Sequence, residues 1–381
     1  MSQPGPVTAD VAVIGGGLHG CSAALQLAMC GRSVVVLEKD HVGRHASGVN
    51  AGGVRRLGRD FAEVPMAQRS WEMWQDIQGL VDDDCRFETS GQVKVAETED
   101  ELAVQRKRVA DLQALGFGHE VIIDQGTLRN LLPAVAPHCV GGIHVATDGH
   151  ASPFHTTMAF AAKARALGVD IREGARVEGL ARRNGIWRIE TSNGAVEAPL
   201  LVNCAGAWGS QVAARLGEPV PLSAEAFMLM ITAPMAPFCE PVVGAAGRSL
   251  SFKQFANGTV MVGGGHRGTA DPVTNRTSVD MVGLAESSRT ATAIFPVMAT
   301  ATLVRCWAGI EGETPDVLPY IGPSSTEEGA FHSFGFCGHG FQLGPVVGTI
   351  TASLVCDGVT DLALEPFRID RFPKQTAEDA A

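Results

Sequence analysis

The N-terminal segment holds a glycine pattern that could bind phosphate. Gly15, Gly17 and Gly20 follow the apolar run at residues 10–15 and precede a small apolar segment at 21–30. A buried strand, glycine turn and helix in this order direct free backbone N–H groups and the positive end of a helix dipole at a phosphate. A second apolar run ends at Glu38, whose carboxylate can accept from both hydroxyls of a ribose. This βαβ unit predicts a dinucleotide site.

Three further glycine-rich blocks lie far apart along the chain, at residues 45–55, 204–208 and 335–345. The second follows an apolar run at 200–203, and the third precedes a helix expected near 345–356, with Pro345 in its first turn. A nicotinamide-dependent enzyme would not need these extra clusters. We therefore expect FAD at the dinucleotide site.

In this order and spacing, the four blocks resemble the D-amino-acid oxidase superfamily of FAD enzymes over residues 7–372. The resemblance is strongest to glycine oxidase, sarcosine oxidase and opine oxidase subunits. It implies an α/β (α+β) fold, with a Rossmann-like FAD-binding domain of the glutathione-reductase type and a second, β-rich substrate domain. The FAD-binding domain would comprise 7–85, 141–215 and 305–372, the substrate domain 86–140 and 216–304, and the flexible termini 1–6 and 373–381.

The resemblance also implies which residues contact FAD. They are Gly15, Gly17, Leu18, His19, Gly20, Glu38, Lys39, Ser47, Asn50, Ala51, Gly52, Gly53, Val177, Ala205, Gly206, Trp208, Gly309, Gly338, His339, Gly340, Phe341 and Gln342. The link to FAD should be non-covalent, because Gly309 occupies the position of the cysteine that some members use, and Cys306 is three residues away.

Members of this family oxidise a C–N bond next to a carboxylate by hydride transfer to flavin N5, and the resulting imine hydrolyses. A substrate carboxylate favours a bidentate arginine, so Arg55 or Arg56 is the first candidate, with a surface or interdomain ion pair as the alternative. His266 matches the family position of an active-site histidine, or it is a plain loop histidine.

Two positions depart from the family pattern. Gln342 stands where a relative has a carboxylate-binding lysine, and Glu311 stands where another has an arginine. Both differences remove positive charge and favour a larger amine, an opine-like secondary amine or an N-substituted glycine over a small free amino acid. Glu311 would contact a cationic substrate group or form an ion pair with an arginine.

The electron acceptor is O2 or another compound. Val262 stands about where a relative carries a lysine that favours O2 reduction, which predicts slow reoxidation by O2. Two other functions fit the same pattern, namely a 2-hydroxy-acid dehydrogenase and a flavin-carrying subunit of a hetero-oligomeric oxidase. The second of these allows an oligomer.

Composition narrows the functional classes. The formal net charge of −11 disfavours nucleic-acid binding, which needs a basic face. Nine scattered cysteines without a CxxC pattern argue against a zinc ribbon or disulfide framework, and Asp82–Asp84 reads as a solvated loop, so we expect no metal. The sequence shows no secretory signal and no apolar run of the ~18–20 residues that a membrane helix needs, so we expect a soluble cytoplasmic protein.

A surface helix is expected at residues 97–116. Thr98 can cap its start, with Glu101 three residues later as the partner in a capping box. Its apolar face would comprise Leu102, Val109, Leu112 and Leu115. A further helix is expected at 158–167.

Overall fold

The computed structural model describes residues 6–373. The first βαβ unit forms as the sequence predicts, with β2 at Val11–Ile14, α1 at Leu18–Met29 and β3 at Val34–Leu37. Every residue of both strands is buried, as in parallel strands covered on two faces. Cys30 is the C-cap of α1, and Gly31 follows in the left-handed region with φ +79°.

These strands belong to a six-stranded sheet with the order β21-β22-β13-β2-β3-β9. The other members are β9 (Asp170–Arg172), β13 (Leu200–Asn203), β21 (Tyr320–Pro323) and β22 (Ala330–Phe334). All neighbouring pairs are parallel except β21 with β22. The parallel strands therefore end at one edge of the sheet, and three blocks that are distant in sequence, beginning at Gly15, Cys204 and Gly335, meet there.

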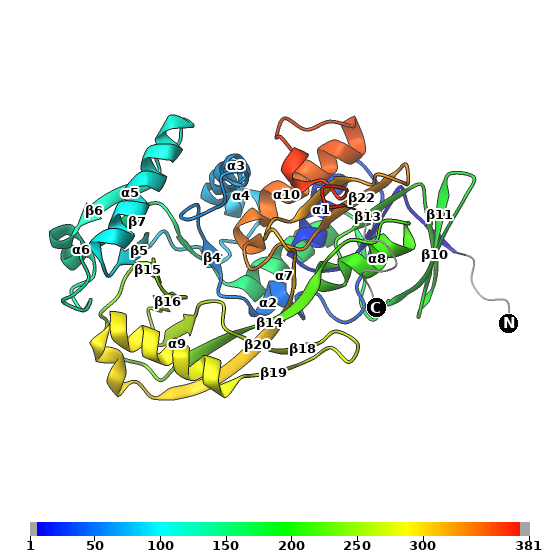
Figure 1. Cartoon of the computed structure of the whole chain (residues 1–381). Helices are drawn as coiled ribbons and strands as arrows, with labels where there is room; N and C mark the ends of the chain where they lie inside the picture. The colour runs from blue at the N-terminus through cyan, green and yellow to red at the C-terminus, as the bar shows by residue number, and fades with distance from the viewer. Residues whose placement is uncertain (1–5, 374–381) are drawn as a thin grey trace.

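The two faces of this sheet are covered differently (Figure 1). Alternate residues such as Val13 and Val36 pack with helices on one face, while Ile14 and Leu37 pack with a small sheet on the other. The helices are α1, α3 (Val64–Gln75), α4 (Ile77–Val81), α7 (Pro153–Ala166) and α10 (Gly340–Asp357). The small sheet has the order β1-β12-β11-β10, formed by Val7–Thr8, Gly194–Ala198, Ile186–Thr191 and Val177–Arg183.

A larger, ten-stranded sheet forms the other half of the molecule (Figure 1). Its strands are β5 (Gln92–Ala96), β6 (Val121–Asp124), β7 (Gly141–Val145), β14 (Ser223–Thr232), β15 (Val242–Ala245), β16 (Ser251–Gln254), β17 (Val260–Gly263), β18 (Arg267–Asp271), β19 (Arg276–Ser278) and β20 (Leu303–Glu313). Its helical elements are α5 (Glu99–Ala114), α6 (Gln125–Leu131), α9 (Met281–Ile294) and η2 (Pro296–Thr300). A separate apolar core, which includes Val93, Phe252 and Phe295, lies under this sheet.

Short elements connect the two halves or close their edges. They are α2 (Ala46–Val49), β4 (Gly53–Val54), β8 (Gly149–His150), η1 (Gly206–Trp208), α8 (Gly209–Arg215) and η3 (Glu365–Phe367). Strands β4 and β8 pair with each other outside both large sheets. No helix between residues 6 and 373 is long and apolar enough to cross a membrane.

Several helix boundaries differ from those expected from the sequence. Helix α10 begins at Gly340, so Pro345 lies inside the helix and not in its first turn. Helix α7 begins five residues before the expected start, at Pro153. In α5, Thr98 caps the helix by accepting from the Glu101 N–H at 3.2 Å, but Leu115 is 59% exposed and does not join the apolar face.

The strand pairing also bears on the domain boundaries. The proposed division assigns residues 141–145 to the FAD-binding domain, but β7 pairs with β5 and β6 in the large sheet. A boundary after residue 145 therefore fits the pairing better. The predicted flexible termini lie outside the described residues, apart from Pro6 and Pro373.

Candidate cofactor and substrate site

A cavity of about 390 Å³ lies at the edge of the six-stranded sheet where the parallel strands end. We call it the first cavity. The predicted cofactor residues that line it are Gly15, Gly17, Leu18, His19, Glu38, Lys39, Ser47, Asn50, Val177, Ala205, Gly206, Trp208, Gly338, Gly340 and Phe341. They come from separate blocks of the chain, and the sheet order brings them together.

The glycine loop is held by side chains from two other segments. Ser47 Oγ accepts from the Leu18 N–H at 2.9 Å. The Glu38 carboxylate accepts from the Gly16 N–H at 2.7 Å and the Asp40 N–H at 2.8 Å, while burial raises its pKa. Gly20 does not line the cavity. A Cβ there would lie 1.9 Å from the Gly15 carbonyl oxygen, so Gly20 allows α1 to approach the loop.

A hairpin from the large sheet reaches over one end of the first cavity. Its strands are β18 and β19, and its turn contributes Pro272, Val273 and Asn275 to the lining. Lys39 Nζ donates to Asn275 Oδ1 at 2.6 Å, and Trp208 Nε1 donates to the Pro272 carbonyl at 2.8 Å. This hairpin could not be predicted from local sequence, because nothing in residues 267–278 resembles a nucleotide motif.

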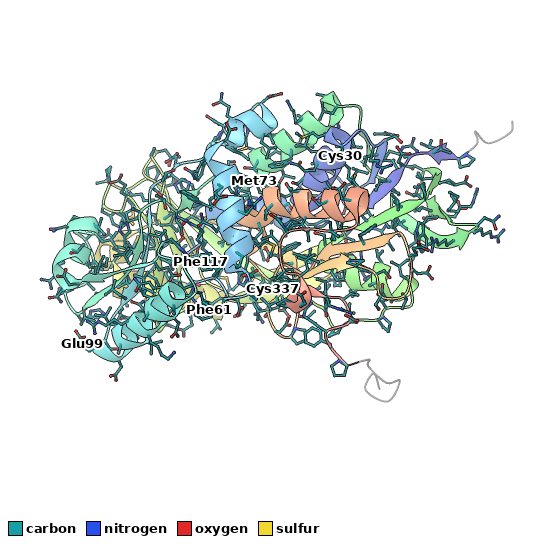
Figure 2. All side chains as sticks on the ribbon, turned by 90° about the horizontal axis from the view of Figure 1, so that it is seen from above. Cys30, Phe61, Met73, Glu99, Phe117 and Cys337 are labelled. Atoms are coloured by element: carbon teal, nitrogen blue, oxygen red, sulfur yellow. The ribbon has the colours of Figure 1, made fainter. Side chains whose placement is uncertain are left out.

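A second cavity, of about 450 Å³, lies between the loop at 49–59 and the large sheet. The predicted residues that line it are Asn50, Ala51, Gly52, Gly53, Arg55, Gly309, Glu311, Gly338, His339 and Phe341. The residues that line both cavities are Asn50, Glu311, Cys337, Gly338 and Phe341. Cys337 lies near the middle of the molecule, just before α10 (Figure 2). The two cavities are therefore neighbours that share one wall.

The structure separates the two candidate arginines. Arg55 lines the second cavity, and its Nη1 donates to the Leu57 carbonyl at 2.6 Å. Arg56 lines neither cavity. Its guanidinium lies 3.4 Å from Asp148, donates to Gln68 and stacks 4.0 Å from the centre of the Trp71 ring. Arg56 therefore forms an ion pair, which was the alternative to its binding the substrate carboxylate.

Glu311 lies on the shared wall of the two cavities. No cation lies within 4.0 Å of its carboxylate in the described part of the chain, so the expected alternative of an ion pair with arginine is not observed. Burial raises the pKa of Glu311 to about 7, partly opposed by a hydrogen bond from the Gly338 backbone. This carboxyl can therefore change protonation state near neutral pH.

Gln342 is fully buried and does not line either cavity. Its side chain accepts from Arg59 Nη2 at 3.0 Å and donates to the Ala67 carbonyl at 2.9 Å. The helix α10 begins at Gly340, which directs Gln342 toward α3. We therefore correct the prediction of a cofactor or substrate contact for Gln342.

His339 lines the second cavity beside a buried carboxylate that the sequence analysis missed. Its Nδ1 lies 3.6 Å from Glu63, which also lies 3.6 Å from Arg59. Burial lowers the pKa of His339, and the adjacent Glu63 carboxylate opposes that shift.

The structure does not bring His266 to either cavity. Strand β17 ends at Gly263, and Gly264 and Gly265 turn the chain away. These two glycines are the residues of segment 260–266 that line the second cavity. The His266 backbone carbonyl accepts from the Met228 N–H, and its Cβ packs near Gly283 of α9. The prediction of an active-site histidine at this position is corrected to the loop alternative.

The acidic run at 82–84 forms surface ion pairs. Asp82 lies 2.7 Å from Lys163 Nζ, and Asp83 lies 2.9 Å from His155. Asp84 is exposed next to this pair. These contacts agree with a solvated loop.

Comparisons with known proteins agree with this geometry. A family profile described as FAD-dependent oxidoreductase matches residues 10–354. Glycine oxidase from Geobacillus kaustophilus is 26% identical over 374 residues, covering 95% of this chain and 97% of that protein. An opine oxidase subunit from Rhizobium meliloti is 25% identical over 380 residues, covering 97% and 99%. The chain belongs to the FAD-dependent oxidoreductase family.

A solved structure supports the same assignment. L-Proline dehydrogenase from P. horikoshii superposes with a TM-score of 0.89 at 27% identity, covering 96% of this chain and 98% of that one. The fold class is thus confirmed as the two-part α/β architecture of these oxidoreductases.

The first cavity fits FAD, the cofactor of this family. The glycine loop leaves no room for a side chain at Gly15, where a Cβ would lie 2.4 Å from the Cys204 carbonyl oxygen. A backbone that is kept bare beside a helix N-terminus is what a pyrophosphate needs. Gly15, Gly17 and Ser47 would hold the pyrophosphate, and Glu38 the ribose.

Cys306, the cysteine nearest to Gly309 in the sequence, lies on the other face of β20. Cys306 and Gly309 are three residues apart, so they lie on opposite faces of the strand. Cys306 packs against the core under the large sheet, while Gly309 lines the second cavity. This geometry keeps Cys306 from replacing the linkage cysteine, as expected for a non-covalent cofactor.

A lysine that was not predicted from the sequence, Lys253, lies beside the loop at residues 50–53. Val262 is buried in the core under the large sheet, as expected for an apolar residue. On the neighbouring strand β16, Lys253 is 4% exposed and its Nζ donates to the Ala51 carbonyl. Burial lowers the pKa of Lys253 to about 7. Lys253 therefore supplies a cation beside this loop, although residue 262 is a valine.

Proposed function

We propose that this enzyme oxidises the C–N bond of an amino acid or a secondary amine, next to a carboxylate, and that the imine product hydrolyses. The observation that carries the proposal is the pair of uncompensated charges facing one cavity, Arg55 and Glu311, beside the first cavity. When bound, FAD accepts a hydride at N5 and so supplies the oxidation. The protein residues bind the substrate, orient its C–H bond and exclude water.

Arg55 would bind the substrate carboxylate. Its guanidinium has no carboxylate partner within 4.0 Å in residues 6–373, and burial lowers its pKa to about 10, so it stays charged at neutral pH. A substrate carboxylate would supply the missing charge-assisted hydrogen bonds. The rigid pairing would also fix the orientation of the adjacent carbon.

Glu311 would hold the substrate nitrogen. An amine gives up a hydride more readily when its nitrogen is unprotonated, so an ammonium substrate must lose a proton in the site. A carboxylate with a pKa of about 7 can accept that proton near neutral pH. A 2-hydroxy acid has no cationic group for Glu311, so this residue favours an amine over the alternative of a 2-hydroxy-acid dehydrogenase.

The names of the relatives support the same substrate class. Glycine oxidase, opine oxidase and L-proline dehydrogenase are each named for a compound with a nitrogen next to a carboxylate-bearing carbon. Glu311 in place of an arginine still favours a larger or N-substituted amine, whereas Gln342 lines neither cavity and no longer bears on the substrate. Either O2 or another compound would then reoxidise the cofactor.

Anaerobic bleaching of the bound FAD tests this function. Amino acids, N-substituted glycines, opine-type amines and 2-hydroxy acids are mixed separately with the purified holoenzyme, and absorbance near 450 nm is followed. We expect at least one amine to bleach the cofactor and the hydroxy acids to leave it oxidised. Bleaching by hydroxy acids alone would establish the dehydrogenase alternative, and no bleaching by any compound would favour a flavin-carrying subunit.

A further inference from the structure

One strand of the large sheet presents two polar side chains to the second cavity. In β5, Val93 and Val95 are fully buried in the core under the sheet. Because successive side chains point to opposite faces, Gln92 and Lys94 face the other way, and both line the second cavity. Polar residues on this face of a buried strand need a partner, since burial without one is costly.

The charges around this cavity do not balance. Three buried carboxylates lie near the loop at 55–59, and each already has an arginine partner. The pairs are Asp148 with Arg56 at 3.4 Å, Glu120 with Arg108 at 2.9 Å and Glu63 with Arg59 at 3.6 Å. Arg55 and Lys94 both line the cavity, and no carboxylate lies within 4.0 Å of either one anywhere in residues 6–373.

A second observation concerns Gln92. Its side chain is only 7% exposed, and its carbonyl oxygen has no hydrogen-bond partner. This oxygen is an acceptor, so it can take a hydrogen bond from a ligand N–H or O–H group but does not bind an anion, which leaves the anion to Lys94. Burial lowers the pKa of Lys94, and the positive charges of Arg108 and Arg55 lower it further. An anion beside Lys94 would relieve that electrostatic repulsion.

We propose that Lys94 binds a second anionic group of the substrate, and that the substrate is an amine bearing two carboxylates. This inference rests on the proposed function and names the substrate class of the same site. The cavity offers two unpaired cations, Arg55 and Lys94, and one carboxylate, Glu311. A dicarboxylic amine carries the complementary set of two negative charges and one positive charge, whereas a simple amino acid leaves one cation unpaired.

Two ligands that lack nitrogen isolate this subsite from the oxidation chemistry. Thiodiacetate and (methylthio)acetate share a thioether and a carboxylate, but only thiodiacetate has a second carboxylate. Each is titrated into the FAD-loaded protein, and the shift of the flavin spectrum gives a dissociation constant. We expect thiodiacetate to bind about tenfold or more tightly than (methylthio)acetate, as a charge-assisted contact implies.

Variants at residue 94 test whether Lys94 causes the tighter binding of thiodiacetate. Lys94→Met should abolish the preference for thiodiacetate while changing the dissociation constant of (methylthio)acetate by no more than about twofold. Lys94→Arg should retain the preference, because it keeps the positive charge. Lys107→Met is the matched control, because Lys107 is exposed on α5 and pairs with Asp111. If Lys94→Met does not fold, Lys94→Gln takes its place with the same expectation.

Two binding results would overturn the inference. One is a wild-type protein that binds both ligands equally. The other is a Lys94→Met variant that weakens both to the same degree, which would mean that Arg55 and Lys94 share one carboxylate. A different result would contradict the proposed function, namely that no amine of any class bleaches the bound FAD. Faster bleaching by monocarboxylic than by dicarboxylic amines would overturn the substrate class alone.

Discussion

At the scale of single residues, Glu38 links the glycine loop to the end of β3. Its carboxylate accepts from two backbone N–H groups and faces the first cavity. We predict that Glu38→Ala weakens FAD binding by about 1.5–3 kcal/mol, because a charge-assisted hydrogen bond to ribose is lost. Fluorescence titration of the apoprotein with FAD measures this. Glu178→Ala, an exposed site on β10, is the control, and an unchanged affinity in Glu38→Ala would place this residue away from the ribose.

The two adjacent arginines should behave differently. Arg55→Ala should weaken carboxylate ligands by about 1.5–3 kcal/mol with little loss of stability, since its guanidinium has no carboxylate partner within residues 6–373. Arg56→Ala should instead lower the free energy of unfolding by about 1–3 kcal/mol, because it leaves the buried Asp148 with fewer partners. Ligand titration and urea unfolding of both variants measure these effects. Equal effects on ligand binding would contradict the assignment of Arg55.

Lys253 bears on the earlier expectation that O2 reoxidises the cofactor slowly, because it supplies a cation that residue 262 lacks. A positive charge beside the cofactor stabilises the negative charge that develops during O2 reduction. We predict that Lys253→Met slows reoxidation by O2 about tenfold or more, with little change for an artificial acceptor dye. In the wild type, the O2 rate should fall as pH rises through about 7, because Lys253 loses its proton there. Stopped-flow mixing of reduced enzyme with aerated buffer measures both. A Lys253→Met variant as fast as the wild type would rule out this role.

At the scale of elements, the hairpin of β18 and β19 links the large sheet to the first cavity. Its turn holds Lys39 through Asn275 and Trp208 through the Pro272 carbonyl. We predict that Asn275→Ala increases the dissociation rate of FAD severalfold, because one hydrogen bond across the cavity is lost, worth about 0.5–1.5 kcal/mol. Release of FAD fluorescence after dilution measures the rate. Thr277→Ala, on β19 outside the turn, is the control, and equal rates in both variants would show that the turn does not retain the cofactor.

The start of α10 shows how an element decides the role of a residue. The Rossmann-type strands and α1 were predictable, because buried apolar runs and glycine spacing are local signals. The helix start at Gly340 was not, because Pro345 suggested a later start and α10 tolerates it inside the helix. That shift of about one turn is what turns Gln342 toward Ala67 and away from the cavities.

At the scale of the whole molecule, the two halves meet at the shared wall of the cavities. Gly309 and Cys306 lie on opposite faces of β20, so the protein offers no cysteine at the family's linkage position. We predict that acid precipitation releases all FAD into the supernatant. A yellow pellet would contradict non-covalent binding.

Local sequence signals were enough to predict the cofactor fold and the residues of the glycine loop, because strand, turn and helix signals lie within about 30 consecutive residues. They also identified Arg55 and Glu311 as candidates. The three-dimensional arrangement was needed to distinguish Arg55 from Arg56 and to remove His266 and Gln342 from the cavities. It was also needed to bring Lys94 to the second cavity, Lys253 to the Ala51 carbonyl and Glu63 to His339. Those outcomes depend on strand pairing and helix packing between segments tens to hundreds of residues apart, which no local pattern encodes.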